Sequence, residues 1–119
     1  MESKGKKVRR LTLLKDLVAF NKPIEIIADG LSQLDWDYKG QSLSVSSSQI
    51  RSILQRFLVG KFTAKDLENW ANLIECREDI EYEGDRYEAI ENVIYCLANP
   101  SIQGEITLVL CENMINTLN

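Results

Sequence analysis

Apolar residues recur at three- and four-residue intervals along most of this 119-residue chain. This spacing places side chains on one face of an α-helix, so it limits the possible folds more than any single motif does. Between residues 63 and 75, for example, Leu67, Trp70, Ala71 and Ile74 form an i, i+3, i+4, i+7 stripe, which predicts a core position for Trp70. The chain is long enough to bury a core without metals or disulfides. The sequence therefore predicts an all-α fold.

Turn and capping residues divide this pattern into a compact bundle of about five to six short helices. Ser46 and Gln49 have the spacing of a capping box, and Thr63 is a good N-cap. The predicted helices are Leu11–Asn21, Ile24–Leu34, one from the N-cap Ser46 to Gly60, one starting at Thr63, Asp85–Ala98, and one from about Thr107 onward. We expect residues 1–10 to be a basic, flexible tail and residues 11–119 to be a single helical domain.

Three local features have consequences for the fold. Leu43 and Val45 alternate with serines, so residues 42–46 fit either a short strand or an extended approach to the next helix. We favour the second, because no other segment looks like a pairing strand. The loop at Phe62–Thr63 is short enough to predict an antiparallel hairpin of the two flanking helices. In the helix Asp85–Ala98, we expect Tyr87 to face inward together with the apolar residues.

The sequence contains no histidine, which excludes Ser-His-Asp and Cys-His nucleophile pairs and the commonest general base. It has no phosphate-binding glycine loop and no nucleophile elbow. Cys76, Cys96 and Cys111 lack the spacing of metal ligands, so we expect buried reduced thiols. We predict no enzyme activity, no cofactor and no metal. One alternative is a metal or acid–base pair formed by Glu75 and Asp79, which would lie one helical turn apart.

No apolar run approaches the roughly 18 residues that a membrane helix requires. The basic stretch Lys4–Arg10 precedes the apolar segment Leu11–Phe20, as in a signal peptide. However, Lys15 and Asp16 interrupt that segment, and no small-residue cleavage site follows. We therefore expect a cytoplasmic protein with no membrane partner.

Charge is distributed unevenly. Residues 1–22 contain seven Lys and Arg against two acids, a net +5, whereas residues 23–119 contain seven against sixteen, a net −9. Six acids lie between Glu75 and Asp85, where a negative potential could steer a basic partner. Aromatic residues beside acids are typical of interface hot spots. The candidate partner-binding residues are Glu75, Glu78, Asp79, Glu81, Tyr82, Glu83, Asp85 and Trp36.

Four segments carry a resemblance to a known family: Leu31–Asp37, Ile53–Asn72, Ile74–Ile80 and Leu97–Pro100. In these segments the chain resembles immunity proteins of bacterial contact-dependent growth inhibition systems, over roughly residues 31–118. The resemblance implies a small helical protein that binds and neutralises a cognate secreted toxin domain. Many such toxins are nucleases, whose basic active-site cleft an acidic segment would complement. The alternative is a regulatory adaptor or nucleic-acid-associated protein that uses the basic N-terminal tail, although the acidic remainder would repel phosphate.

Overall fold

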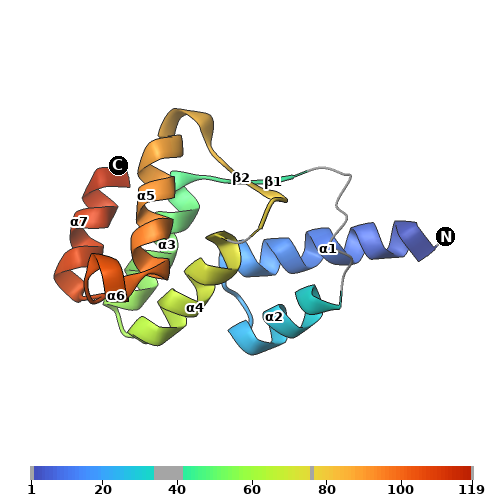
Figure 1. The fold of residues 1–119 in the computed structure, drawn as a ribbon, viewed down its shortest axis with the longest axis horizontal. Coiled ribbons are helices and arrows are strands. Elements are labelled where there is room, and N and C mark those ends of the chain that lie inside the picture. The colour runs from blue at the N-terminus through green and yellow to red at the C-terminus, as the bar shows by residue number, and fades with distance from the viewer. Residues whose placement is uncertain (1, 34–41, 76, 119) are drawn as a thin grey trace.

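Helices account for most of the computed structural model, which describes residues 2–33, 42–75 and 77–118, with side chains from Arg10 onward (Figure 1). The α-helices are α1 (Glu2–Ala19), α2 (Ile24–Ser32), α3 (Ser47–Leu58), α4 (Ala64–Glu75), α5 (Tyr87–Ala98), α6 (Pro100–Gln103) and α7 (Leu108–Leu118). The remaining elements are strands β1 (Leu43–Val45) and β2 (Ile80–Tyr82) and the 3₁₀ helix η1 (Gly84–Arg86). The predicted all-α class is confirmed, with one very small sheet added to it.

The main helix pairs of the fold do not include α3 with α4, which follow one another along the chain. Helix α4 packs along α5, and α3 packs along α7. Helix α1 packs against α2 on the other side of the molecule (Figure 1). The predicted hairpin of α3 with α4 is therefore wrong. The turn between them contains Gly60 at φ +86°, and the ring of Phe62 stacks on Phe20 at the end of α1, 4.1 Å between centroids. The turn is thus held against α1, and α4 leaves it in a direction that does not follow α3.

Trp70 lies at the centre of the core, as its place in the helical stripe predicted. Its side chain is completely buried, and its indole Nε1–H donates a hydrogen bond of 2.6 Å to the carbonyl oxygen of Leu17. A buried indole needs such an acceptor, because an unpaired N–H in an apolar core costs free energy. This bond joins α4 to α1 across 53 positions of sequence.

The C-terminal end of α1 is fixed by a side chain from α3. Phe20 follows the helix at φ +48°, the left-handed conformation that often ends helices. Arg56 donates from Nη1 to the carbonyl oxygen of Ala19 at 2.8 Å and from Nη2 to that of Phe20 at 3.0 Å. Its guanidinium also lies 4.5 Å from the ring centre of Phe62. These contacts satisfy helix-end carbonyls that would otherwise lack donors. The helix starts at Glu2, well before the predicted start at Leu11; the flexibility of residues 1–10 stays a prediction.

The segment 42–46 contains a strand, so our preference for an unpaired extended approach is wrong. Strand β1 pairs with β2 in parallel, with Leu43 opposite Ile80 and Val45 opposite Tyr82. The sequence concealed the pairing because β2 is only three residues long and lies within the acidic run. The main-chain bonds from Leu43 N to Asp79 O and from Glu83 N to Val45 O extend the ladder at both ends.

Most helix starts agree with the predicted caps. Ser46 and Gln49 form the predicted capping box before α3. Thr63 Oγ1 accepts from the N–H of Asp66, which in turn accepts from the N–H of Thr63. Helix α5 starts at Tyr87 and not at Asp85, because residues 84–86 form η1. Pro100 begins the short helix α6, which was not predicted from the sequence, and its fixed φ suits the first turn.

Candidate functional site

The predicted acidic run spans three elements: the end of α4, the strand β2 and the 3₁₀ helix η1. Glu75 is the last residue of α4, so Glu75 and Asp79 do not share a helix face as the sequence suggested. The structure separates the candidate residues into one buried carboxylate, Asp79, and a set of groups at the surface.

Asp79 is 1% exposed and is held by two arginines. Arg77 donates from Nε to Oδ1 at 2.8 Å and from Nη2 to Oδ2 at 2.7 Å, and Arg10 of α1 donates from Nη1 to Oδ2 at 2.9 Å. Burial by itself would raise the pKa of the Asp79 carboxyl, but the hydrogen bonds from both arginines outweigh it and the pKa is lowered. The pKa of Arg77 is raised, chiefly by its hydrogen bond to Asp79.

The prediction that Asp79 contacts a partner is therefore wrong. Its carboxylate is committed to an internal ion pair that joins α1 to the start of β2, and nothing of it is presented to solvent. The same two arginines occupy the oxygens that a metal would need, so the alternative of a metal or acid–base pair with Glu75 loses one of its two members. Within the described residues, no three Cys, Asp or Glu side chains converge as metal ligands would.

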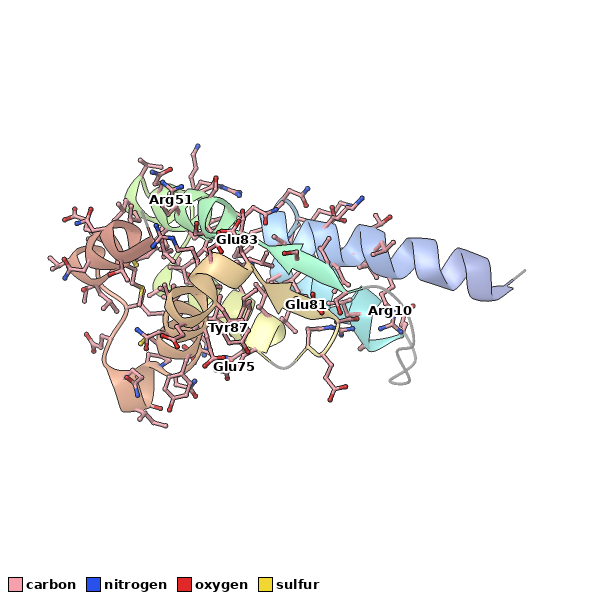
Figure 2. All side chains as sticks on the ribbon, turned by 90° about the horizontal axis from the view of Figure 1, so that it is seen from above. Arg10, Arg51, Glu75, Glu81, Glu83 and Tyr87 are labelled. Carbon is pink, nitrogen blue, oxygen red and sulfur yellow. The ribbon has the colours of Figure 1, made fainter. Side chains whose placement is uncertain are left out.

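A groove of about 740 Å³ lies between β2 and α5, and the last residue of α4, Glu75, also lines it. We call it the tyrosine–glutamate groove. Its lining residues are Glu75, Arg77, Ile80, Glu81, Tyr82, Tyr87, Glu88, Glu91, Asn92, Ile94 and Tyr95. Figure 2 shows that the labelled members Glu75, Glu81 and Tyr87 lie in one region, with Arg10 farther along β2. Four glutamates thus line the groove together with one cation, Arg77, which is already paired with Asp79.

Two tyrosines form the wall of the groove near η1. The ring centres of Tyr82 and Tyr87 lie 5.6 Å apart with the planes tilted by 54°. Burial, followed by the negative charges of Glu75 and Glu91, raises the pKa of Tyr82 to about 12. The pKa of Tyr87 is also raised, first by its hydrogen bond to Glu91. Both phenols therefore remain neutral at physiological pH and keep O–H donors beside the carboxylates.

Sequence reasoning found part of this groove and missed the rest. Glu75, Glu81 and Tyr82 were predicted and lie in it, although Tyr82 is partly buried and not an exposed anchor. The prediction that Tyr87 faces the core is wrong, because it is 49% exposed. The missed residues of α5 are Tyr87, Glu88, Glu91, Asn92 and Tyr95. Along the chain, these residues are separated by one, three, one and three positions, which places them on one face of a helix. This pattern could have shown that the acidic run continues onto a face of the following helix.

The remaining predicted residues do not line the groove. Glu78 and Asp85 are exposed, Glu78 just before β2 and Asp85 in η1. Glu83 is partly buried and accepts a 3.5 Å hydrogen bond from Ser47 Oγ at the start of α3. Trp36 lies outside the described residues. Cys111 is buried as predicted and Cys96 is partly buried, while Cys76 also falls outside the description.

Comparison of the chain with protein-family models, with curated proteins and with solved structures gives no match in any of the three. Among the described residues, no helix combines the length and the apolar character needed to span a bilayer. The assignment of function therefore depends on the chemistry of the groove: four carboxylates, three phenols and little positive charge, an arrangement that suits lysine and arginine side chains.

Proposed function

We propose that this protein is an immunity protein that binds a toxin domain through the tyrosine–glutamate groove and blocks its activity. The observation that carries the proposal is the composition of that groove, which four glutamates line together with the exposed rings of Tyr87 and Tyr95. Tyrosine and charged residues grouped in a concave surface are typical of protein–protein hot spots.

Charge favours a basic partner. Residues 23–119, which include every residue that lines the groove, have a net charge of −9. Such a surface accelerates association with a positive one and repels nucleic acid. A nuclease toxin has the required complement, because the cations that bind its phosphate substrate can pair with the glutamates instead. The resemblance to immunity proteins in the segments Ile53–Asn72 and Ile74–Ile80 supports the same function.

The aromatic rings add contacts that charge alone would not provide. Tyr87 and Tyr95 are 49% and 42% exposed. They lie on the same face of α5, one helical turn before and one turn after Glu91. A lysine or arginine that reaches Glu91 would also lie against these rings, where its cation is attracted by the aromatic face. The phenol of each ring can hydrogen-bond to the partner's backbone.

The test is toxin neutralisation by a charge-reversal variant. The candidate toxin is the product of the neighbouring upstream gene, because immunity and toxin genes are expected to be adjacent. The variant changes Glu75, Glu88 and Glu91 to lysine. We expect its affinity for the toxin domain to fall by about a hundredfold or more, measured by calorimetry, together with a loss of protection in a toxicity assay.

A matched control carries the same change of charge elsewhere on the surface. Glu25, Glu105 and Glu112 are exposed and do not line the tyrosine–glutamate groove. Changing these three to lysine should leave binding within a few fold. Equal protection by both variants would remove the groove from the mechanism. Salt-sensitive binding of DNA or RNA by the wild-type protein, lost on deleting residues 1–10, would instead support the nucleic-acid alternative.

A further inference from the structure

Strand β2 has an open edge. In the parallel ladder, Leu43 N donates to Asp79 O and Glu83 N donates to Val45 O, with Leu43 opposite Ile80. This register directs the N–H and C=O groups of Glu81 toward β1 and those of Ile80 and Tyr82 away from it. Within the described part of the chain, no backbone hydrogen bond reaches these outward groups of Ile80 and Tyr82.

The open edge borders the tyrosine–glutamate groove. Ile80, Glu81 and Tyr82 all line it from one side, and α5 lines it from the other. Figure 2 shows β1 on one side of β2 and the labelled Glu75 and Tyr87 on the other. Among the described residues, the β2 wall of the groove therefore carries unpaired backbone groups of Ile80 and Tyr82, and the α5 wall carries Tyr87, Glu88, Glu91 and Tyr95. A volume of about 740 Å³ lies within the range of ligand-binding pockets.

We propose that the groove binds an extended, basic segment of the partner, which pairs with the backbone of Ile80 and Tyr82 as a third strand of the sheet. An unpaired strand edge is a template for a further strand, and the added main-chain hydrogen bonds supply affinity. Alternate side chains of such a segment point to opposite faces, so every second residue can place a lysine or arginine near Glu75 and Glu91. The inference rests on the proposed function in one respect, because it assumes that the groove is the surface to which the partner binds.

A helical segment would be a poorer occupant. The main-chain N–H and C=O groups of a helix are bonded to one another, so a helix cannot satisfy the edge of β2. A helix with its side chains is also about 10–12 Å wide, whereas a strand takes a position about 4.8 Å from its neighbour. An extended segment supplies both the main-chain bonds that the edge lacks and the cations that the glutamates attract.

The test uses the full chain, labelled with ¹⁵N, and a short peptide that alternates lysine with valine. In the free protein, the amides of Ile80 and Tyr82 should exchange with solvent faster than the amide of Glu81, which bonds to β1. Saturating peptide should slow exchange at Ile80 and Tyr82 by about tenfold or more and leave Glu81 almost unchanged. Glu81 is thus an internal control on the same strand. Unchanged exchange at Ile80 and Tyr82 with the peptide bound would overturn the inference, as would absence of binding at millimolar peptide.

A second peptide, in which proline replaces each valine, has the same charge but lacks half of the N–H donors. It favours the polyproline II conformation, which turns every three residues and does not align its remaining donors along one edge. We expect it to bind at least about fivefold more weakly. Equal affinity of the two peptides would show that charge alone accounts for their binding. That result would overturn the proposal that the segment binds as a third strand. That result leaves toxin neutralisation intact, so the strand inference and the proposed function fail in different experiments.

Discussion

Replacing Asp79 with asparagine preserves the size of the side chain but removes the negative charge that Arg10 and Arg77 share. The three side chains are 2%, 11% and 18% exposed, so water cannot readily take the place of the lost carboxylate. The Asp79→Asn variant leaves two guanidinium groups close together, and the asparagine amide can accept at one oxygen only. Breaking a buried ion pair by removing one partner usually destabilises a protein by about 3–5 kcal/mol.

We expect the lower end of that range, about 3 kcal/mol, because the asparagine side chain keeps one oxygen that can accept a hydrogen bond from the arginines. The free energy of unfolding of a domain is typically about 5–15 kcal/mol, so the expected loss is a large fraction of the total stability. It corresponds to a fall in Tm of roughly 10 °C. Urea unfolding followed by circular dichroism measures the change. The matched control is Glu81→Gln, two positions along the chain and exposed, which should change stability by less than about 0.5 kcal/mol.

The pH dependence provides an independent check on the cause. The pKa of the Asp79 carboxyl is lowered from its ordinary value of 3.8, so its contribution to stability is present above that pH. The contribution is lost as the pH falls through the lower pKa of the folded state, where the carboxylate becomes protonated. The difference between wild type and Asp79→Asn should therefore be constant near neutral pH and shrink below about pH 4. A difference under about 0.5 kcal/mol at pH 7, or one that does not change on acidification, would refute the ion-pair reasoning.

Four further outcomes follow from other contacts in the structure. Trp70→Phe should lower the free energy of unfolding by about 2 kcal/mol in urea titrations, because it removes the hydrogen bond to Leu17 and leaves a small cavity. Ser46→Ala should lower it by about 1 kcal/mol, since the capping box before α3 is lost; a cost near zero would show that the cap contributes nothing. Ultraviolet titration should find the phenol of Tyr82 ionising near pH 12, and stability should fall as the pH rises from 10 to 12, because the unfolded chain ionises first. Glu91→Gln should lower that pKa, and an unchanged value would contradict the placement of its charge.

Only one wall of the tyrosine–glutamate groove could be predicted from the sequence. The other wall was missed because the position of a tyrosine, in the core or at the surface, is hard to infer. A density of acids around Glu75 and Glu81 is visible in the sequence, and it marked one wall of the groove. The other wall depends on which face of α5 carries Tyr87, and a tyrosine suits either a core or a surface position. Because Tyr87 was expected to face the core, Glu88, Glu91 and Tyr95 were not connected with the candidate residues of the acidic run.

Local chemistry determined the helices. The stripe that includes Trp70 and the capping pairs of Ser46 and Thr63 depend on residues within one or two turns of each other, so the sequence alone specifies them. Tertiary structure decided everything that joins distant positions: Leu43 with Ile80, and Arg10 with Asp79, 69 residues apart. A three-residue strand or a single carboxylate has no periodic pattern of its own, and its partner is chosen by how the helices pack. Only that packing turned an acidic run into one buried carboxylate and an open, charged groove.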